Sequence, residues 1–183
     1  MRSIYLAGPE VFLADAAGVG REKKQLCEAH GFRGLFPLDA ELSLLAHASR
    51  AIFDANVALI RGCDAVIANL TPFRGASADA GTVFEIGMAF GLGKPIFAYT
   101  NVAESYAIRV VDADRPAAQG LVAEDGLNVE DFDLFDNLMI AEAIRAQGRE
   151  VVARAAAVES RYTDLAGFER CLRQAAAHFA ALG

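Results

Sequence analysis

The first hundred residues alternate between short apolar runs and longer amphipathic segments. The apolar runs are rich in β-branched and aromatic residues and mostly stop close to a Gly or Pro, which is typical of buried strands. We predict strands at residues 3–7, 32–36, 64–70 and 96–99. Between them the apolar positions recur with helical spacing, which predicts helices at residues 15–30, 49–61 and 79–93.

This alternation predicts an α/β fold: a single-domain, flavodoxin-like or Rossmann-like parallel sheet flanked by helices on both faces. We prefer the flavodoxin-like order, because no G-x-G-x-x-G fingerprint of the dinucleotide fold opens a helix. The pattern weakens over residues 101–136, which predicts a long surface excursion. Helical patterns return at residues 137–147 and 164–182, and a fifth strand has two candidates, residues 130–134 and 151–152.

An acidic side chain, Glu85, stands inside the most apolar of the predicted helices. Asp79 is a good N-cap and Gly93 a good stop, so we expect a helix of about three turns between them. Because apolar residues surround nearly all of this helix, we expect it to be buried on most of its surface. A carboxylate there must be partnered, exposed at a cleft, or functional. The alternative is that Glu85 only complements the positive end of its helix.

Composition narrows the classes of partner. The chain has 183 residues, 54% of them hydrophobic, which suits one domain with a substantial core. A net charge of -7 and a pI near 4.9 argue against binding to nucleic acid or to an anionic membrane surface. No apolar run approaches the roughly 20 residues of a membrane span, and no signal-peptide pattern opens the sequence. We expect a cytoplasmic protein that binds a small molecule.

Neither cysteine nor histidine spacing suggests a metal centre, a disulfide framework or a hydrolase triad. Cys27, Cys63 and Cys171 lie far apart, and we expect them to be small buried hydrophobic residues. The three histidines have no neighbouring ligand in metal register, and no G-x-S-x-G motif is present.

The expected chemistry lies in the loops that follow the strands, because open α/β sheets bind ligands outside the carboxyl ends of their strands. Asp39, Asp79 and Glu85 lie in or after such loops, whereas Asp64 stands at the start of the third strand. Several carboxylates around one cleft suit glycosidic transfer, in which one acid attacks or stabilises an oxocarbenium-like carbon and another handles the leaving group's proton. Magnesium is the alternative, but its sites normally accompany a phosphate-binding loop, which we do not find. We therefore expect no metal and no cofactor.

An ordered set of motifs resembles the nucleoside 2-deoxyribosyltransferase family. The combination of D-x-G-T-x-F-E-x-G with a later N-L-M is more specific than any single piece, and it spans residues 3–140, leaving residues 145–183 as a C-terminal helical extension. The segments that carry the resemblance are Tyr5–Pro9, Phe53–Asn56, Cys63–Asp64, Asn69–Gly75, Asp79–Gly87 and Asn137–Met139.

The resemblance implies transfer of a 2-deoxyribosyl group between nucleobases by double displacement, through a covalent intermediate on Glu85. It implies that Asp79 holds the sugar hydroxyls, that Tyr5 orients the nucleophile, and that Asp64 contacts the base and assists its protonation. A buried acid beside the base keeps a proton at neutral pH, because burial raises its pKa. It further implies a homo-oligomer in which Asn137 binds the sugar of a neighbouring site. From the residues alone, Asp64 is alternatively a cap at the strand start, and Tyr5 a plain core tyrosine.

Further candidates for substrate contact come from the same loops and motifs. Phe12 stacks on the base or belongs to the core, and Arg74 touches the ligand or braces its own loop. Gly8 allows close approach of the backbone. Asp39 after the second strand and Met139 of the N-L-M segment complete the set.

The expected partners are 2′-deoxynucleosides and free nucleobases. Some relatives in the family instead hydrolyse the N-glycosidic bond of nucleotides, but Glu10 beside Gly8 would repel a 5′-phosphate, so a free nucleoside fits better. Two other classes stay open: a non-catalytic nucleotide-binding module, and a flavodoxin-like redox protein, which would need a Ser/Thr-rich phosphate loop after the first strand. The extension at residues 145–183 is a candidate for an oligomer contact.

Overall fold

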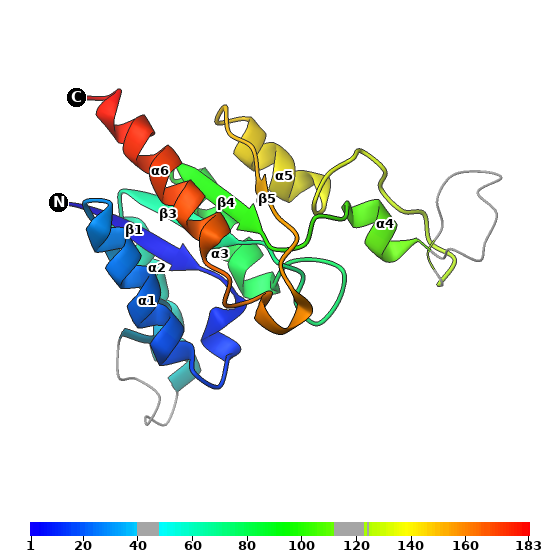
Figure 1. Cartoon of the computed structure of the whole chain (residues 1–183), viewed down its shortest axis with the longest axis horizontal. Coiled ribbons are helices and arrows are strands. Elements are labelled where there is room, and N and C mark those ends of the chain that lie inside the picture. The colour runs from blue at the N-terminus through cyan, green and yellow to red at the C-terminus, as the bar shows by residue number, and fades with distance from the viewer. Residues whose placement is uncertain (40–47, 112–122, 124) are drawn as a thin grey trace.

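Parallel strands form one five-stranded sheet in the order β2-β1-β3-β4-β5 (Figure 1). The computed structural model describes residues 1–39, 48–111, 123 and 125–183. The predicted α/β class and its flavodoxin-like strand order are confirmed. The strands are β1 (Arg2–Ala7), β2 (Phe32–Leu35), β3 (Ala65–Asn69), β4 (Ile96–Thr100) and β5 (Val152–Ala153).

Helices follow the strands at nearly all the predicted places. None of them, within the described ranges, is long and apolar enough to cross a membrane. The α-helices are α1 (Ala16–Ala29), α2 (Ala48–Gly62), α3 (Ala80–Gly91), α4 (Tyr106–Val110), α5 (Leu138–Arg145) and α6 (Ala166–Ala180), and the short 3-10 helices are η1 (Pro9–Phe12), η2 (Pro37–Asp39) and η3 (Val158–Ser160).

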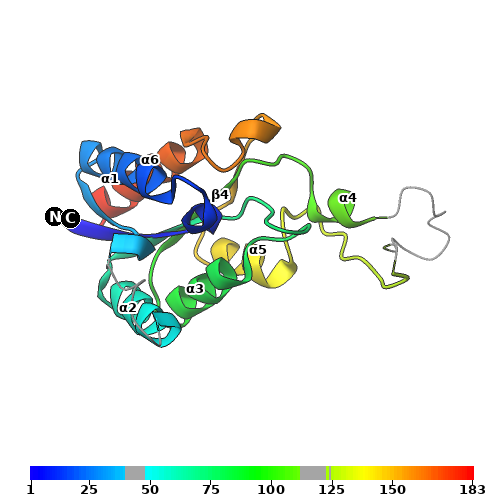
Figure 2. The ribbon, with the colours of Figure 1, turned by 90° about the horizontal axis from the view of Figure 1, so that it is seen from below.

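The sheet is covered on both faces, with α1 and α6 on one side and α2, α3 and α5 on the other (Figure 2). Side chains of a strand alternate between faces, so Ile4 and Leu6 pack toward α1 and α6 while Tyr5 points the other way, toward α3. All three are fully buried. The first strand therefore contributes apolar side chains to the core on one face, and the hydroxyl group of Tyr5 on the other face.

The C-terminal residues 145–183 belong to this core and are not an appendage to it. β5 pairs with the end of β4, and α6 buries Phe168, Cys171 and Leu172 against the sheet. The segment expected to be a helical extension thus contains a strand, β5, as well as α6. Of the two candidates for the fifth strand, residues 151–152 overlap the observed one, whereas residues 130–134, which the structure describes, form no strand.

Helix α3 is less buried than its composition predicts. Thr82, Ile86 and Ala89 are buried, but Phe84 and Phe90 are 57% and 45% exposed. The expectation of burial over most of the helix is wrong, because one stripe of α3 faces the sheet while α2 and α5 cover only its flanks. Phe84 consequently lines an open pocket beside Glu85, whereas Phe90 lines a groove between α3 and α5.

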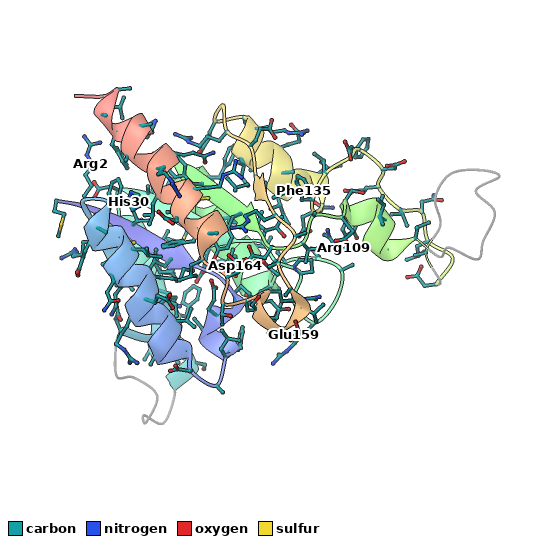
Figure 3. All side chains as sticks on the ribbon, viewed as in Figure 1. Arg2, His30, Arg109, Phe135, Glu159 and Asp164 are labelled. Atoms are coloured by element: carbon teal, nitrogen blue, oxygen red, sulfur yellow. The ribbon has the colours of Figure 1, made fainter. Side chains whose placement is uncertain are left out.

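The excursion after β4 is tied back to the loop that precedes α3. Arg109 of α4 donates from Nε to the carbonyl of Ala76 at 2.9 Å, and from Nη2 to the carbonyl of Phe135 at 2.6 Å (Figure 3). Asp136 is almost fully buried and accepts a bond of 2.8 Å from the amide of Ala78. These contacts hold the N-terminal end of α3. Residues 112–122 and 124 of the excursion lie outside the described residues.

The place of α6 in the core can be tested with a matched pair of leucines. Leu172 is fully buried on α6, whereas Leu182 near the chain end is 65% exposed. Leu172→Ala should lower the free energy of unfolding by about 2–5 kcal/mol, because it leaves a cavity. Leu182→Ala should change it by less than about 0.5 kcal/mol. Urea denaturation measures both, and equal small losses would contradict a core position for α6.

Candidate active site

A hydrogen bond joins two of the predicted site residues across the core. The hydroxyl of Tyr5 on β1 donates to Oε1 of Glu85 on α3 at 2.5 Å. β1 is an interior strand, and Tyr5 is fully buried on the face that α3 covers. The pairing of the early Tyr with the helical Glu, expected from the family resemblance, is thus present in the fold.

This environment places the titration of Glu85 near neutral pH. Burial raises the pKa of Glu85 to about 7, the hydrogen bond from Tyr5 lowers it, and the nearby Asp79 carboxylate raises it again. Burial and the Glu85 carboxylate both raise the pKa of Tyr5 above its usual range. The Tyr5 hydroxyl therefore keeps its proton and serves as a donor, while Glu85 exchanges its proton in the physiological range.

Asp79 begins the helix that carries Glu85, as its N-cap propensity predicts. Its Oδ2 accepts bonds from the amide and the hydroxyl of Thr82, at 2.9 and 3.1 Å. Its Oδ1 makes no hydrogen bond within the described part of the chain and is available to a ligand. Across the same residues, no group of three His, Cys, Asp or Glu side chains is arranged to hold a metal ion.

A pocket of about 280 Å³ opens between α2 and α3 next to Glu85. The rings of Phe53 and Phe84 pack against each other in its wall, with centroids 6.1 Å apart, and each is about half exposed. Oδ1 of Asn56 is buried there and finds no partner among the described residues, a state that costs free energy unless a ligand or water bonds it. The lining residues of this α2–α3 pocket are Phe53, Asn56, Val57, Ile60, Gly81, Phe84 and Glu85.

Sequence reasoning missed Asn56, Phe53 and Phe84 as site residues. A signal was present, because Phe53 and Asn56 stand together in one of the family-like segments and lie three residues apart, which places them on one helical face. What the sequence does not show is that α2 turns this face toward Glu85.

Asp64 does not hold the place expected of a base-protonating acid. It precedes β3 at the amino end of the sheet, is exposed, and does not line the α2–α3 pocket. Its Oδ2 accepts bonds from the amide and hydroxyl of Ser3, at 2.7 and 3.0 Å, and these bonds hold the pKa of Asp64 below its usual range. The expectation of a proton kept by burial is therefore wrong, and Asp64 caps the start of the strand.

Glu10 does not present its charge to a ligand. It is fully buried, with Oε1 2.7 Å from Nζ of Lys23, so the argument that Glu10 repels a 5′-phosphate is wrong. Gly8 lies directly against it, and a Cβ on Gly8 would collide with Oε2 of Glu10. Close packing thus accounts for glycine at this position, and approach of its backbone to a ligand stays a prediction.

Phe12 and Arg74 form a cluster of their own with Phe73. The rings of Phe12 and Phe73 stack with centroids 5.1 Å apart, and the Arg74 guanidinium lies 4.7 Å from the Phe73 centroid. Arg74 has a φ of 54°, in the left-handed region where non-glycine residues are uncommon. Arg74 therefore braces its loop, and contact of Phe12 or Arg74 with a ligand stays a prediction.

The remaining candidates lie apart from the α2–α3 pocket. Asp39 accepts a bond of 2.6 Å from Nζ of Lys24 on α1. Asn137 caps α5 by accepting from the amide of Met139 at 3.0 Å, and Met139 is 73% exposed on a groove between α3 and α5. Their contact with substrate, and the reach of Asn137 into a neighbouring subunit, stay predictions.

Known proteins resemble the chain in both sequence and fold. A structure described as the 2-desoxiribosyltransferase from Leishmania mexicana is 30% identical, covers 90% of this chain and 97% of its own, and superposes with a TM-score of 0.67. An uncharacterized protein of Schizosaccharomyces pombe is 30% identical over 164 residues, covering 79% of this chain and 78% of its own. A conserved protein from Enterococcus faecalis V583, 21% identical over 96% of this chain and 99% of its own, shares the fold with a TM-score of 0.51.

The family profile described as Nucleoside 2-deoxyribosyltransferase matches residues 4–139. The match contains Tyr5, Asp79 and Glu85 together with the pocket residue Asn56. The profile covers well over half of the sequence. The Leishmania mexicana structure matches 90% of this chain and so supports the same family. The chain therefore belongs to the nucleoside 2-deoxyribosyltransferase family.

Proposed function

We propose that the protein transfers the 2-deoxyribosyl group of a 2′-deoxynucleoside from one nucleobase to another. The observation that carries this proposal is the half-buried Glu85, which is bonded to Tyr5 and lies beside an aromatic pocket. Family membership and the name of the Leishmania mexicana relative support the same reaction.

The reaction proceeds in two displacements at one carbon. The Glu85 carboxylate attacks C1′ as the C1′–N bond breaks, the bonding pair leaves with the base, and the base takes a proton from solvent. The sugar is then an ester of Glu85. A nitrogen of the second base attacks C1′, loses its proton, and releases the carboxylate. Two inversions retain the β-configuration.

The surroundings of Glu85 suit a group that must both attack and leave. Burial strips water from the carboxylate, which makes it a stronger nucleophile, and the Tyr5 hydroxyl holds Oε1 so that Oε2 faces the reacting carbon. The free Oδ1 of Asp79, at the start of the same helix, is placed to accept a bond from a sugar hydroxyl.

The base occupies the α2–α3 pocket in this proposal. A planar heteroaromatic ring fits against the faces of Phe53 and Phe84, and stacking on aromatic side chains tolerates different bases. Asn56 then offers an amide to the polar edge of the base, which would give its buried Oδ1 the partner it lacks among the described residues.

Chromatography of the products distinguishes the candidate functions. With 2′-deoxyinosine and adenine, the protein should form 2′-deoxyadenosine, and Glu85→Ala should lower that rate by at least about 10³-fold because the nucleophile is gone. Glu22→Ala, on the exposed side of α1, is the matched control and should leave the rate unchanged. Release of hypoxanthine without a new nucleoside would identify a hydrolase instead. No product from this or a pyrimidine donor would favour a binding module.

The pH dependence of kcat/KM should report the titration of Glu85. Because the ionised carboxylate attacks, activity should rise through a midpoint at pH of about 7. The hydrogen bond from Tyr5 lowers the pKa of Glu85, so Tyr5→Phe should move the midpoint upward by about one to two pH units. The variant should therefore lose more activity at pH 6 than at pH 9. An unchanged or lower midpoint would contradict the role given to this bond.

The role of Asn56 is tested by a substitution of similar shape. Asn56→Leu removes the amide and should raise the KM for the acceptor base about tenfold or more, with a smaller change in kcat. Asn128→Leu, at an exposed position, controls for the chemical change itself. Steady-state kinetics with adenine as the varied substrate would measure both KM values. A normal KM in a folded Asn56→Leu protein would show that the base does not bind in the α2–α3 pocket.

A further inference from the structure

A fully buried carboxylate, Glu10, lies on the face of the sheet opposite to Glu85 and takes no part in the chemistry proposed above. Glu10 and Lys23 are both fully buried, and their side chains meet at 2.7 Å. The aromatic rings of Tyr99 and Phe168 enclose the ammonium group, with centroids 5.8 and 4.9 Å from Nζ. Charges are rarely found at such depth, because removing both from water costs free energy that their attraction seldom exceeds.

One oxygen of Glu10 gathers donors from three separate elements. Oε1 accepts from Lys23 on α1, from Nδ2 of Asn69 at the end of β3, at 3.1 Å, and from the hydroxyl of Tyr99 on β4, at 2.9 Å. Burial raises the pKa of Tyr99 well above its usual range, which keeps this donor protonated. Glu10, Lys23, Asn69 and Tyr99 together form what we call the Glu10 clamp.

The clamp continues into the loops at the carboxyl edge of the sheet. Asn69 also accepts, through Oδ1, a bond of 2.9 Å from the amide of Thr71, and the hydroxyl of Thr71 accepts from the amide of Asn101 at 3.0 Å. Glu10 itself belongs to the loop after β1. The same carboxylate thus ties down the loops after β1, β3 and β4, where an α/β sheet binds its ligands.

The loops after β1 and β3 also contact each other directly. Phe12, two residues after Glu10, stacks on Phe73, two residues after Thr71. The β3 loop then continues to Asp79 and the helix of Glu85. A shift of the Glu10 side chain would therefore move both loops together.

We propose that the Glu10 clamp is a positioning device, which fixes the loops after β1 and β3 in the arrangement that receives the substrate, a role that rests on the function proposed above. A buried ion pair is a poor means of stabilising a fold, since apolar residues of similar volume serve as well or better. It is well suited to hold several loop ends in one geometry, because three donors from different elements converge on one buried oxygen and a displaced donor would be left unpaired. Lys23 and Glu10 contribute to activity only through this geometry.

Hydrogen exchange tests the clamp without any assumption about the reaction. In Lys23→Met, the amides of Thr71 and Leu13, which are bonded within the two loops, should exchange at least about tenfold faster than in the wild type. Amides of α5, which packs on the opposite face of the sheet from the clamp, should keep their rates. A uniform increase across all elements would overturn the proposal, because it would indicate general destabilisation.

Should Lys23→Met fail to fold, the double variant Glu10→Leu/Lys23→Met keeps the test open. It replaces the ion pair by apolar side chains of similar volume and removes the oxygen that accepts from Asn69 and Tyr99. The same selective exchange in the two loops is expected of it. A folded clamp variant, single or double, with loop exchange like that of the wild type would overturn the proposal.

Kinetics supply the second readout, provided that the wild type performs the exchange of bases. The clamp variant should lose about 10- to 100-fold in kcat/KM, because misplaced loops bind substrate poorly, while the pH midpoint set by Glu85 stays in place. Arg173→Met, which breaks an exposed ion pair with Glu169 on α6, is the control and should behave as wild type. Wild-type kcat/KM in a folded clamp variant would contradict positioning. An inactive wild type would instead refute the proposed reaction and leave the exchange experiment to decide the clamp.

Discussion

A parallel sheet must be covered by helices on both faces, and this constraint arranges everything else in the molecule. Each crossover returns the chain to the amino end of the sheet, so all strands deliver their loops to one carboxyl edge. The interior strand β1 is buried between two layers of helices. Polar groups on the interior strands must find partners inside the protein, and the Tyr5–Glu85 pair and the Glu10 clamp are two solutions to that requirement.

These solutions differ in their chemistry. On the face covered by α2 and α3, Glu85 receives a bond from the neutral Tyr5, which partly compensates its burial and leaves its pKa at about 7. On the opposite face, Glu10 meets the cation Lys23 and two further donors. A carboxylate bonded to a neutral donor beside an open pocket is able to react, whereas one bonded to three donors in the core is held in place.

The local sequence pattern was sufficient to predict those features that depend on residues within or next to a single helix or strand. The first four strands, the N-cap at Asp79 and the order of the sheet were predictable, because burial on both faces demands continuous apolar runs and short connections. The pairing of Tyr5 with Glu85 was predictable from a resemblance of motifs. The role expected of Asp64 was wrong, since a motif gives a position in sequence but not whether the side chain at that position is buried beside a ligand.

By itself, the sequence determined the fold class, the family-like motifs and the helix on which the candidate nucleophile stands. Only the tertiary structure decided which residues surround that nucleophile. Asn56 and Phe84 line the pocket because α2 packs beside α3 with these side chains turned toward Glu85. Glu10 is held in the buried clamp because Lys23 of α1 packs against it. The physical reason is that side-chain environment depends on packing between elements distant in sequence, whereas secondary structure depends mostly on neighbours along the chain.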